Sequence, residues 1–157
     1  MAKEIERKYL VKDNSFKKIS KGILYRQGYL STNKNAVVRI RIINECGYIA
    51  IKGQGTGITH AEYEYEIPVE EANEMLGTQC QRPIIEKYRY KVPYEGFIWE
   101  VDEFMGENKG LVVAEIELED ENQVFTKPYF IGDEVTDDKR YYNANLVNHP
   151  YKNWHKK

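Results

Sequence analysis

Charged and apolar residues alternate along most of this chain with a period of two. Successive side chains of a β-strand point to opposite faces, so this period predicts strands with one charged face and one apolar face. The pattern predicts eight strands, near residues 3–11, 22–31, 35–44, 47–52, 60–69, 82–91, 96–103 and 111–120. The remaining segments predict a helix or turn near 13–20, a helix near 70–79, and one or two short helices with loops after 121.

The charged face allows two interpretations. An open antiparallel sheet exposes a polar face to water, but such a face usually mixes serine, threonine, glutamine and lysine. Here the face consists largely of acids and bases, and the two signs are segregated by strand. Eight strands can also close into a barrel, which would place these charges inside. We therefore predict an α+β fold, mainly β: an eight-stranded antiparallel closed β-barrel with a few flanking helices, forming one domain over residues 1–157.

Composition limits the classes of protein that fit. The 157 residues carry a formal net charge of −2, which argues against a strongly basic nucleic-acid-binding surface. No apolar run approaches the ~20 residues of a membrane span, and the first residues contain no apolar signal segment. The two cysteines, Cys46 and Cys80, are too few for a disulfide framework. The sequence predicts a cytoplasmic protein that binds neither nucleic acid nor membrane.

Acids and bases on one interior surface have a specific chemical use. Carboxylates bind hard divalent cations such as Mg²⁺, and these cations bridge to phosphate oxygens. Arginine forks and lysine ammonium groups bind the same oxygens directly. Phosphoryl transfer depends mainly on this kind of charge neutralisation and positioning. The interior would therefore suit a highly charged linear phosphate.

The charged strands also carry motifs in a familiar order. They are ExExK at 4–8, RIRI at 39–42, AIKGQ at 50–54, EYEYEI at 62–67, EKYRY at 86–90, WEVDEF at 99–104, AEIEL at 114–118 and EVTDDKRYYNANL at 134–146. This series resembles the CYTH domain, also called the triphosphate tunnel metalloenzyme family. Two departures are mild, because Ala50 replaces a threonine of the family pattern and Tyr88 separates two basic residues without removing either charge.

The resemblance implies a tunnel that hydrolyses or cyclises triphosphates with Mg²⁺ or Mn²⁺, and it implies roles for matching residues. The expected metal ligands are Glu4, Glu6, Asp102, Glu115 and Glu117. The expected phosphate-binding residues are Lys8, Arg39, Arg41, Lys52, Lys87 and Arg89. The expected tunnel-lining residues are Glu62, Glu64, Glu100 and Lys139, although Lys139 also fits a solvated loop. In some family members a tyrosine on the second strand pairs with the motif lysine, which suggests Tyr29 and Lys8 as catalytic residues; Tyr29 equally fits an ordinary strand position.

We expect metal-dependent hydrolysis of inorganic tripolyphosphate, with nucleoside triphosphates as secondary substrates. An adenylate cyclase of class IV type and a thiamine triphosphatase of the same family remain alternatives, because one tunnel could serve all three. A non-catalytic polyphosphate-binding module is the alternative from another class. The expected partner is a small-molecule triphosphate, and the family suggests a homodimer.

Overall fold

The computed structural model describes residues 3–33, 35–56 and 58–154, which form a sheet with short helices around it. Its strands are β1 (Lys3–Val11), β2 (Ile23–Ser31), β3 (Ala36–Ile43), β4 (Cys46–Thr56), β5 (Thr59–Ile67), β6 (Ile85–Tyr94), β7 (Phe97–Phe104), β8 (Val112–Glu117) and β9 (Ile131–Glu134). Its α-helices are α1 (Val69–Thr78) and α2 (Asn143–Asn148). Its 3-10 helices are η1 (Ser15–Lys18), η2 (Gly106–Asn108), η3 (Lys139–Tyr141) and η4 (Tyr151–Asn153).

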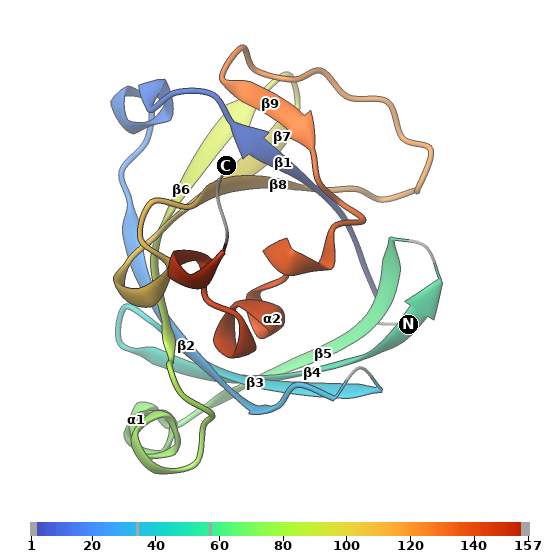
Figure 1. Ribbon diagram of the computed structural model, residues 1–157. Coiled ribbons are helices and arrows are strands. Elements are labelled where there is room, and N and C mark those ends of the chain that lie inside the picture. The colour runs from blue at the N-terminus through green and yellow to red at the C-terminus, as the bar shows by residue number, and fades with distance from the viewer. Residues whose placement is uncertain (1–2, 34, 57, 155–157) are drawn as a thin grey trace.

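The strands close into an antiparallel barrel, as the alternation predicted (Figure 1). They follow the order β5-β4-β3-β2-β6-β7-β8-β1, and β1 then pairs with β5 to complete the ring. That closure is short, because among the described residues it joins Lys3 to Ala61, Glu4 to His60 and Ile5 to Thr59. The predicted eight-stranded closed barrel is therefore confirmed.

A ninth strand was missed by the sequence prediction, which assigned only helices and loops to the region after residue 121. Strand β9 pairs with the second half of β1, where Tyr9 faces Glu134 and Val11 faces Ile131. With four residues it is too short to show a measurable period. Strand β4 also runs to Thr56, beyond the predicted 47–52, because its pairing with β5 continues to the hairpin.

The apolar side chains of the strands point outward, where other segments of the chain cover them. On one side, Trp99 and Tyr9 pack with Phe16 of η1 and with Phe130. On another, Leu76 of α1 packs against Ile40. Strand β2 also lies close to this helix, since a Cβ at Gly28 would lie 3.1 Å from Leu76 Cδ2 and 2.8 Å from the Cβ of Cys80, which follows the helix. Helices and loops thus form the hydrophobic core on the outside of the barrel.

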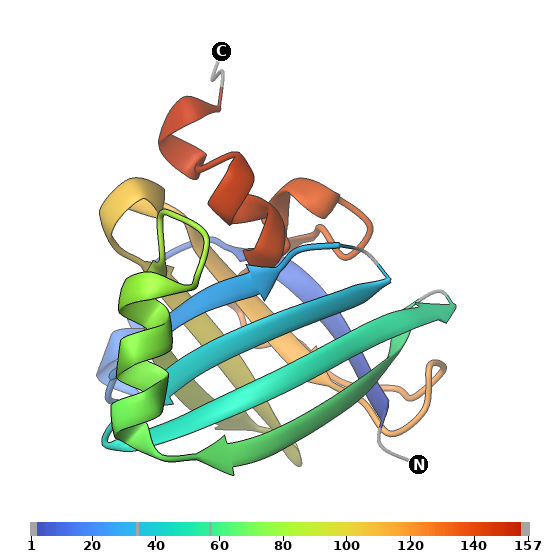
Figure 2. The same ribbon diagram turned by 90° about the horizontal axis from the view of Figure 1, so that it is seen from below.

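The C-terminal segment covers one end of the barrel (Figure 2). Leu146 and Val147 of α2 pack in one cluster with Tyr29, Ile85 and Phe104, which come from β2, β6 and β7. This end is consequently apolar and closed. Within the described residues, no helix is long and apolar enough to cross a membrane.

Candidate active site

The strand register brings the charged side chains of neighbouring strands together inside the barrel. Lys8 of β1 faces Glu115 of β8, and Glu115 also faces Glu100 of β7. On the other side of β7, Asp102 faces Arg89 of β6. Period-two alternation then places every second side chain of these strands on the same inner surface.

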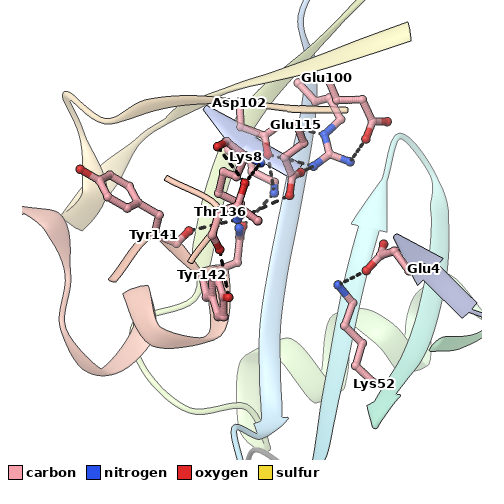
Figure 3. A network of polar contacts seen from close by, with 12 residues as sticks. Glu4, Lys8, Lys52, Glu100, Asp102, Glu115, Thr136, Tyr141 and Tyr142 are labelled. Atoms are coloured by element: carbon pink, nitrogen blue, oxygen red, sulfur yellow. Dashed lines mark hydrogen bonds and ion pairs between the residues drawn. The ribbon is translucent and has the colours of Figure 1, made fainter. Parts of the chain in front are cut away.

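Five of these side chains form what we call the paired cluster: Lys8, Lys87, Arg89, Asp102 and Glu115 (Figure 3). Asp102 is fully buried and accepts two hydrogen bonds from Arg89, at 2.7 Å from Nε and 2.8 Å from Nη2. The Lys87 Nζ lies 2.8 Å from the same carboxylate. Glu115 joins the cluster through Arg89 Nη2 at 3.2 Å and Lys8 Nζ at 3.5 Å.

The carboxylates of the paired cluster are held in their ionised form. Burial opposes ionisation of Glu115, but the neighbouring Lys8 and Arg89 outweigh it and lower the Glu115 pKa. For Asp102, Arg89 and Lys87 likewise outweigh burial and lower the pKa. For Lys87 burial prevails over the attraction of Asp102. Because burial disfavours the charged ammonium form, the Lys87 pKa falls to about 8.

The C-terminal segment contributes contacts that the sequence analysis did not assign. The Oδ1 of Asn143 accepts a hydrogen bond from Lys87 Nζ at 2.8 Å and another from the buried Gln27 amide at 3.3 Å. Lys8 Nζ donates to the Tyr141 carbonyl at 3.2 Å, and the Tyr142 ring lies 5.6 Å from it. The closed end of the barrel therefore contacts the paired cluster directly, as Figure 3 shows for Tyr141 and Tyr142.

A second set of basic residues lies along β3 and β4. Arg39 is 3.4 Å from Glu62 and 3.3 Å from Glu64, and Arg41 is 3.2 Å from Glu64. In both arginines the buried Nε has no hydrogen-bond partner among the described residues. Lys52 contacts Glu4 at 3.0 Å, at a distance from the paired cluster in Figure 3. These cations keep donors for a further acceptor.

Three carboxylates have the opposite electrostatic environment, and we call Glu4, Glu6 and Glu117 the acid group. Burial, followed by repulsion from Glu115 and Glu4, raises the Glu6 pKa well above its ordinary value. Glu117 lies at the exposed end of β8, where partial burial and repulsion from Glu4 and two other glutamates raise its pKa. Burial also raises the Glu4 pKa, although Lys52 opposes the change. This part of the interior holds more negative charge than its cations balance.

The acid group fits a divalent cation in its donor atoms and its charge. Carboxylate oxygens are the ligands of hard cations, and a cation would relieve the repulsion that raises these pKa values. Among the described residues, no three acidic, imidazole or thiol side chains already converge as a ligand set. Asp102 differs from the acid group, because Arg89 and Lys87 already engage both of its oxygens.

Two expected site residues lie differently from the rest. Within the described part of the chain, the Tyr29 hydroxyl is joined to the Gln27 amide at 3.1 Å rather than to Lys8. Lys139 begins η3 with an exposed side chain, so the structure does not bring it together with the interior residues. The neighbouring Tyr141 and Tyr142 supply the contacts to the interior instead.

These features define a class of protein: an antiparallel barrel whose site is its own interior, lined by acids and bases from most of its strands. The family model of the CYTH domain matches residues 2–151. The chain belongs to the CYTH domain family.

Two relatives cover nearly the whole chain. An inorganic triphosphatase of Acetivibrio thermocellus is 60% identical over 154 residues, which are 98% of this chain and 99% of that protein. An inorganic triphosphatase of Nitrosomonas europaea is 37% identical over 149 residues, 92% of this chain and 96% of that protein.

Solved structures agree with this assignment. A crystal structure of an inorganic triphosphatase has a TM-score of 0.65 at 34% identity, covering 94% of this chain and 95% of that one. A Pyrococcus horikoshii protein with a TM-score of 0.57 is 19% identical, covering 76% of this chain and 80% of that one. The second comparison supports the fold alone.

Proposed function

We propose that this protein hydrolyses inorganic tripolyphosphate to pyrophosphate and orthophosphate, with Mg²⁺ or Mn²⁺ as cofactor. The observation that carries the proposal is the interior itself, where buried arginines and lysines from three strands, β1, β3 and β6, lie beside an acid group with unbalanced negative charge. The name of the relative that is 60% identical supports the same reaction. Nucleoside triphosphates would be secondary substrates.

The basic residues would bind the phosphate chain. Within the part of the chain that the structure describes, the Nε groups of Arg39 and Arg41 have no partner, and an arginine fork can bind two phosphate oxygens. Lys8, Lys52, Lys87 and Arg89 add positive charge around the same interior. Water would attack the terminal phosphorus, the bridging P–O bond would break, and pyrophosphate would leave. Charge neutralisation and alignment by these side chains would supply most of the rate enhancement.

The acid group would hold the metal, with Glu4, Glu6 and Glu117 as ligands and Glu115 beside them. Mg²⁺ usually takes only one or two carboxylates and completes its coordination with water and substrate phosphates. A bound divalent cation neutralises phosphate oxygens and bridges them to the protein. We assign Asp102 to positioning Lys87 and Arg89 rather than to direct metal binding.

Product analysis of the purified full chain tests the proposal. Tripolyphosphate with Mg²⁺ or Mn²⁺ should yield orthophosphate and pyrophosphate, and EDTA should abolish the reaction reversibly. Cyclic AMP and pyrophosphate from ATP would instead indicate a cyclase, and faster turnover of thiamine triphosphate would indicate a thiamine triphosphatase. Tight tripolyphosphate binding without turnover at any metal concentration would indicate a binding module. Undiminished turnover in EDTA would contradict the metal mechanism.

The proposal includes a cytoplasmic location and a homodimer, both of which follow from the sequence and the family resemblance. Size-exclusion chromatography with light scattering measures the second of these. A monomer at working concentrations would remove the dimer from the proposal and leave the reaction unaffected.

A further inference from the structure

Strand β2 differs from both of its neighbours in what it presents to the interior. Its inward side chains, Tyr25, Gln27 and Tyr29, are uncharged, whereas β3 on one side and β6 on the other present basic residues. Two of those basic residues are Arg41 of β3 and Arg89 of β6. A strand with an uncharged inner face thus separates two strands with basic inner faces.

The Tyr25 ring contacts the guanidinium groups of both strands. Its centroid lies 4.9 Å from Arg89 Cζ and 5.5 Å from Arg41 Cζ. Tyr25 is 4% exposed, so these contacts are shielded from water. A guanidinium within about 6 Å of an aromatic centroid is attracted by the ring quadrupole, and more strongly when desolvated. One ring therefore stabilises two like charges.

The two arginines differ in how firmly other groups hold them. Arg89 is fixed by two hydrogen bonds to Asp102. Arg41 has a single ion pair, to Glu64 at 3.2 Å, and a buried Nε without a partner among the described residues. Burial and repulsion from Arg39 and Arg89 lower the Arg41 pKa. The position of Arg41 consequently depends more on the Tyr25 ring than that of Arg89 does.

We propose that Tyr25 is a positioning residue for phosphate binding, because its ring holds Arg41 at a fixed spacing from the clamped Arg89. Both guanidinium groups can then face oxygens of one polyphosphate chain. The role requires an electron-rich ring and not a hydroxyl group. The identity of the ligand rests on the proposed function, whereas the ring–arginine contacts do not.

The first experiment compares Tyr25→Phe and Tyr25→Leu in the full chain. Tripolyphosphate KM and kcat are measured with Mg²⁺, and the tripolyphosphate Kd is measured without metal by calorimetry. Tyr25→Phe should stay within about twofold of the wild type. Tyr25→Leu should raise KM and Kd about tenfold, the scale of one or two lost cation–π contacts, with a smaller change in kcat. Tyr88→Leu, on the outer parity of β6, is the matched control and should change neither constant.

A second experiment separates the ring's charge distribution from its volume. Placing 4-cyanophenylalanine at position 25 keeps the ring's shape and withdraws its electron density, so Kd should rise above that of Tyr25→Phe. The cyanophenylalanine variant also tests the proposal if the Tyr25→Leu protein fails to fold. In an Arg41→Lys background, Tyr25→Leu should add much less than tenfold, because the tyrosine acts through that arginine.

The inference would be overturned if Tyr25→Leu bound tripolyphosphate as tightly as the wild type, or if Tyr25→Phe and Tyr25→Leu lost equal affinity. It would also be overturned if cyanophenylalanine and phenylalanine at position 25 gave the same Kd, or if the effects of Tyr25→Leu and Arg41→Lys on Kd were fully additive. Failure of the proposed function would look different. The wild type would then bind tripolyphosphate without turnover, and the effects of the Tyr25 variants on Kd would still be measurable.

Discussion

The paired cluster and the acid group line the same barrel, yet their charges are arranged in opposite ways. In the paired cluster every carboxylate contacts a cation, and the pKa values of Asp102 and Glu115 fall. In the acid group, burial and repulsion from neighbouring carboxylates raise the pKa values of all three glutamates, although Glu4 contacts Lys52 at 3.0 Å. The first region pairs each carboxylate with cations, whereas the second leaves Glu6 and Glu117 in an environment that opposes their ionisation.

Strand β1 joins the two regions. Glu6 and Lys8 are two residues apart and therefore lie on the same face, roughly 6–7 Å apart along the strand. Lys8 reaches the closed end of the barrel through the Tyr141 carbonyl, whereas Glu4 lies where β1 pairs with β5. The interior thus changes from neutralised to acidic along one strand. Replacing a carboxylate by its amide should have opposite effects on stability at the two places.

The largest effect is expected for Asp102→Asn in the paired cluster. The change leaves Lys87 and Arg89 buried without their shared carboxylate, and breaking a buried ion pair on one side typically costs about 3–5 kcal/mol. Urea unfolding followed by circular dichroism measures the free energy of unfolding. Glu103→Gln, on the outer face of β7, is the control and should cost far less. A loss below about 1 kcal/mol for Asp102→Asn would show that the cluster is not balanced by this residue.

In the acid group, Glu6→Gln and Glu117→Gln should lower tripolyphosphatase activity at least ~100-fold, the scale of a lost electrostatic contact in a transition state. Neither change should destabilise the metal-free protein, because each removes a repelled charge. Steady-state rates at saturating Mg²⁺ and thermal melts in EDTA measure the two effects. Full activity in both variants would exclude these carboxylates as metal ligands.

Much of the site could be predicted from the sequence, because the period of two determines which side chains share a face. Once the ring closes, Arg39, Lys87 and Glu115 must line one interior whatever the loops do. The same pattern predicts that the apolar side chains of the strands point outward. The interior rather than the outer surface carries the charges because helices and loops cover the outer face with apolar side chains, whereas inside the barrel only the closed end has such cover.

The remaining site residues could not be predicted, because they depend on contacts between distant segments. Asn143 reaches Lys87 only after α2 folds over the barrel end, 56 residues further along the chain. Gln27 and Tyr25 are uncharged, so an alternation of charged residues does not identify them as site residues. The sequence indicates them only indirectly, because the strand predicted near residues 22–31 is the one for which the alternation gives no charged inner face.

The pH dependence of stability should also differ between the two regions. The folded-state pKa of Glu6 lies well above the ordinary 4.5, so between these values the folded protein binds more protons than the unfolded chain. The free energy of unfolding therefore falls as pH rises through that window, and it stays lower above it. In EDTA, the stability gain of Glu6→Gln over the wild type should grow from pH 4 upward. Added Mg²⁺ should reduce that gain, and a difference independent of pH would contradict the raised pKa.

The smallest effect is expected at Asn143, where the C-terminal segment meets the paired cluster. Asn143→Ala removes the acceptor of two hydrogen bonds and should lower the free energy of unfolding by about 1–2 kcal/mol. Asn143→Asp keeps an acceptor and makes it ionised, which strengthens a hydrogen bond from an ammonium group.

Asn143→Asp should therefore retain wild-type stability or exceed it, and it should raise the Lys87 pKa above about 8. Urea unfolding at pH 7 measures the stability, and NMR titration of the lysine side chains measures the pKa. The same variant should raise the tripolyphosphate KM, since an added carboxylate repels phosphate and competes for Lys87. An Asn143→Asp protein less stable than Asn143→Ala would mean that this end of the interior does not tolerate another negative charge. The contrast with the acid group would then disappear, because both regions would respond to added acid in the same way.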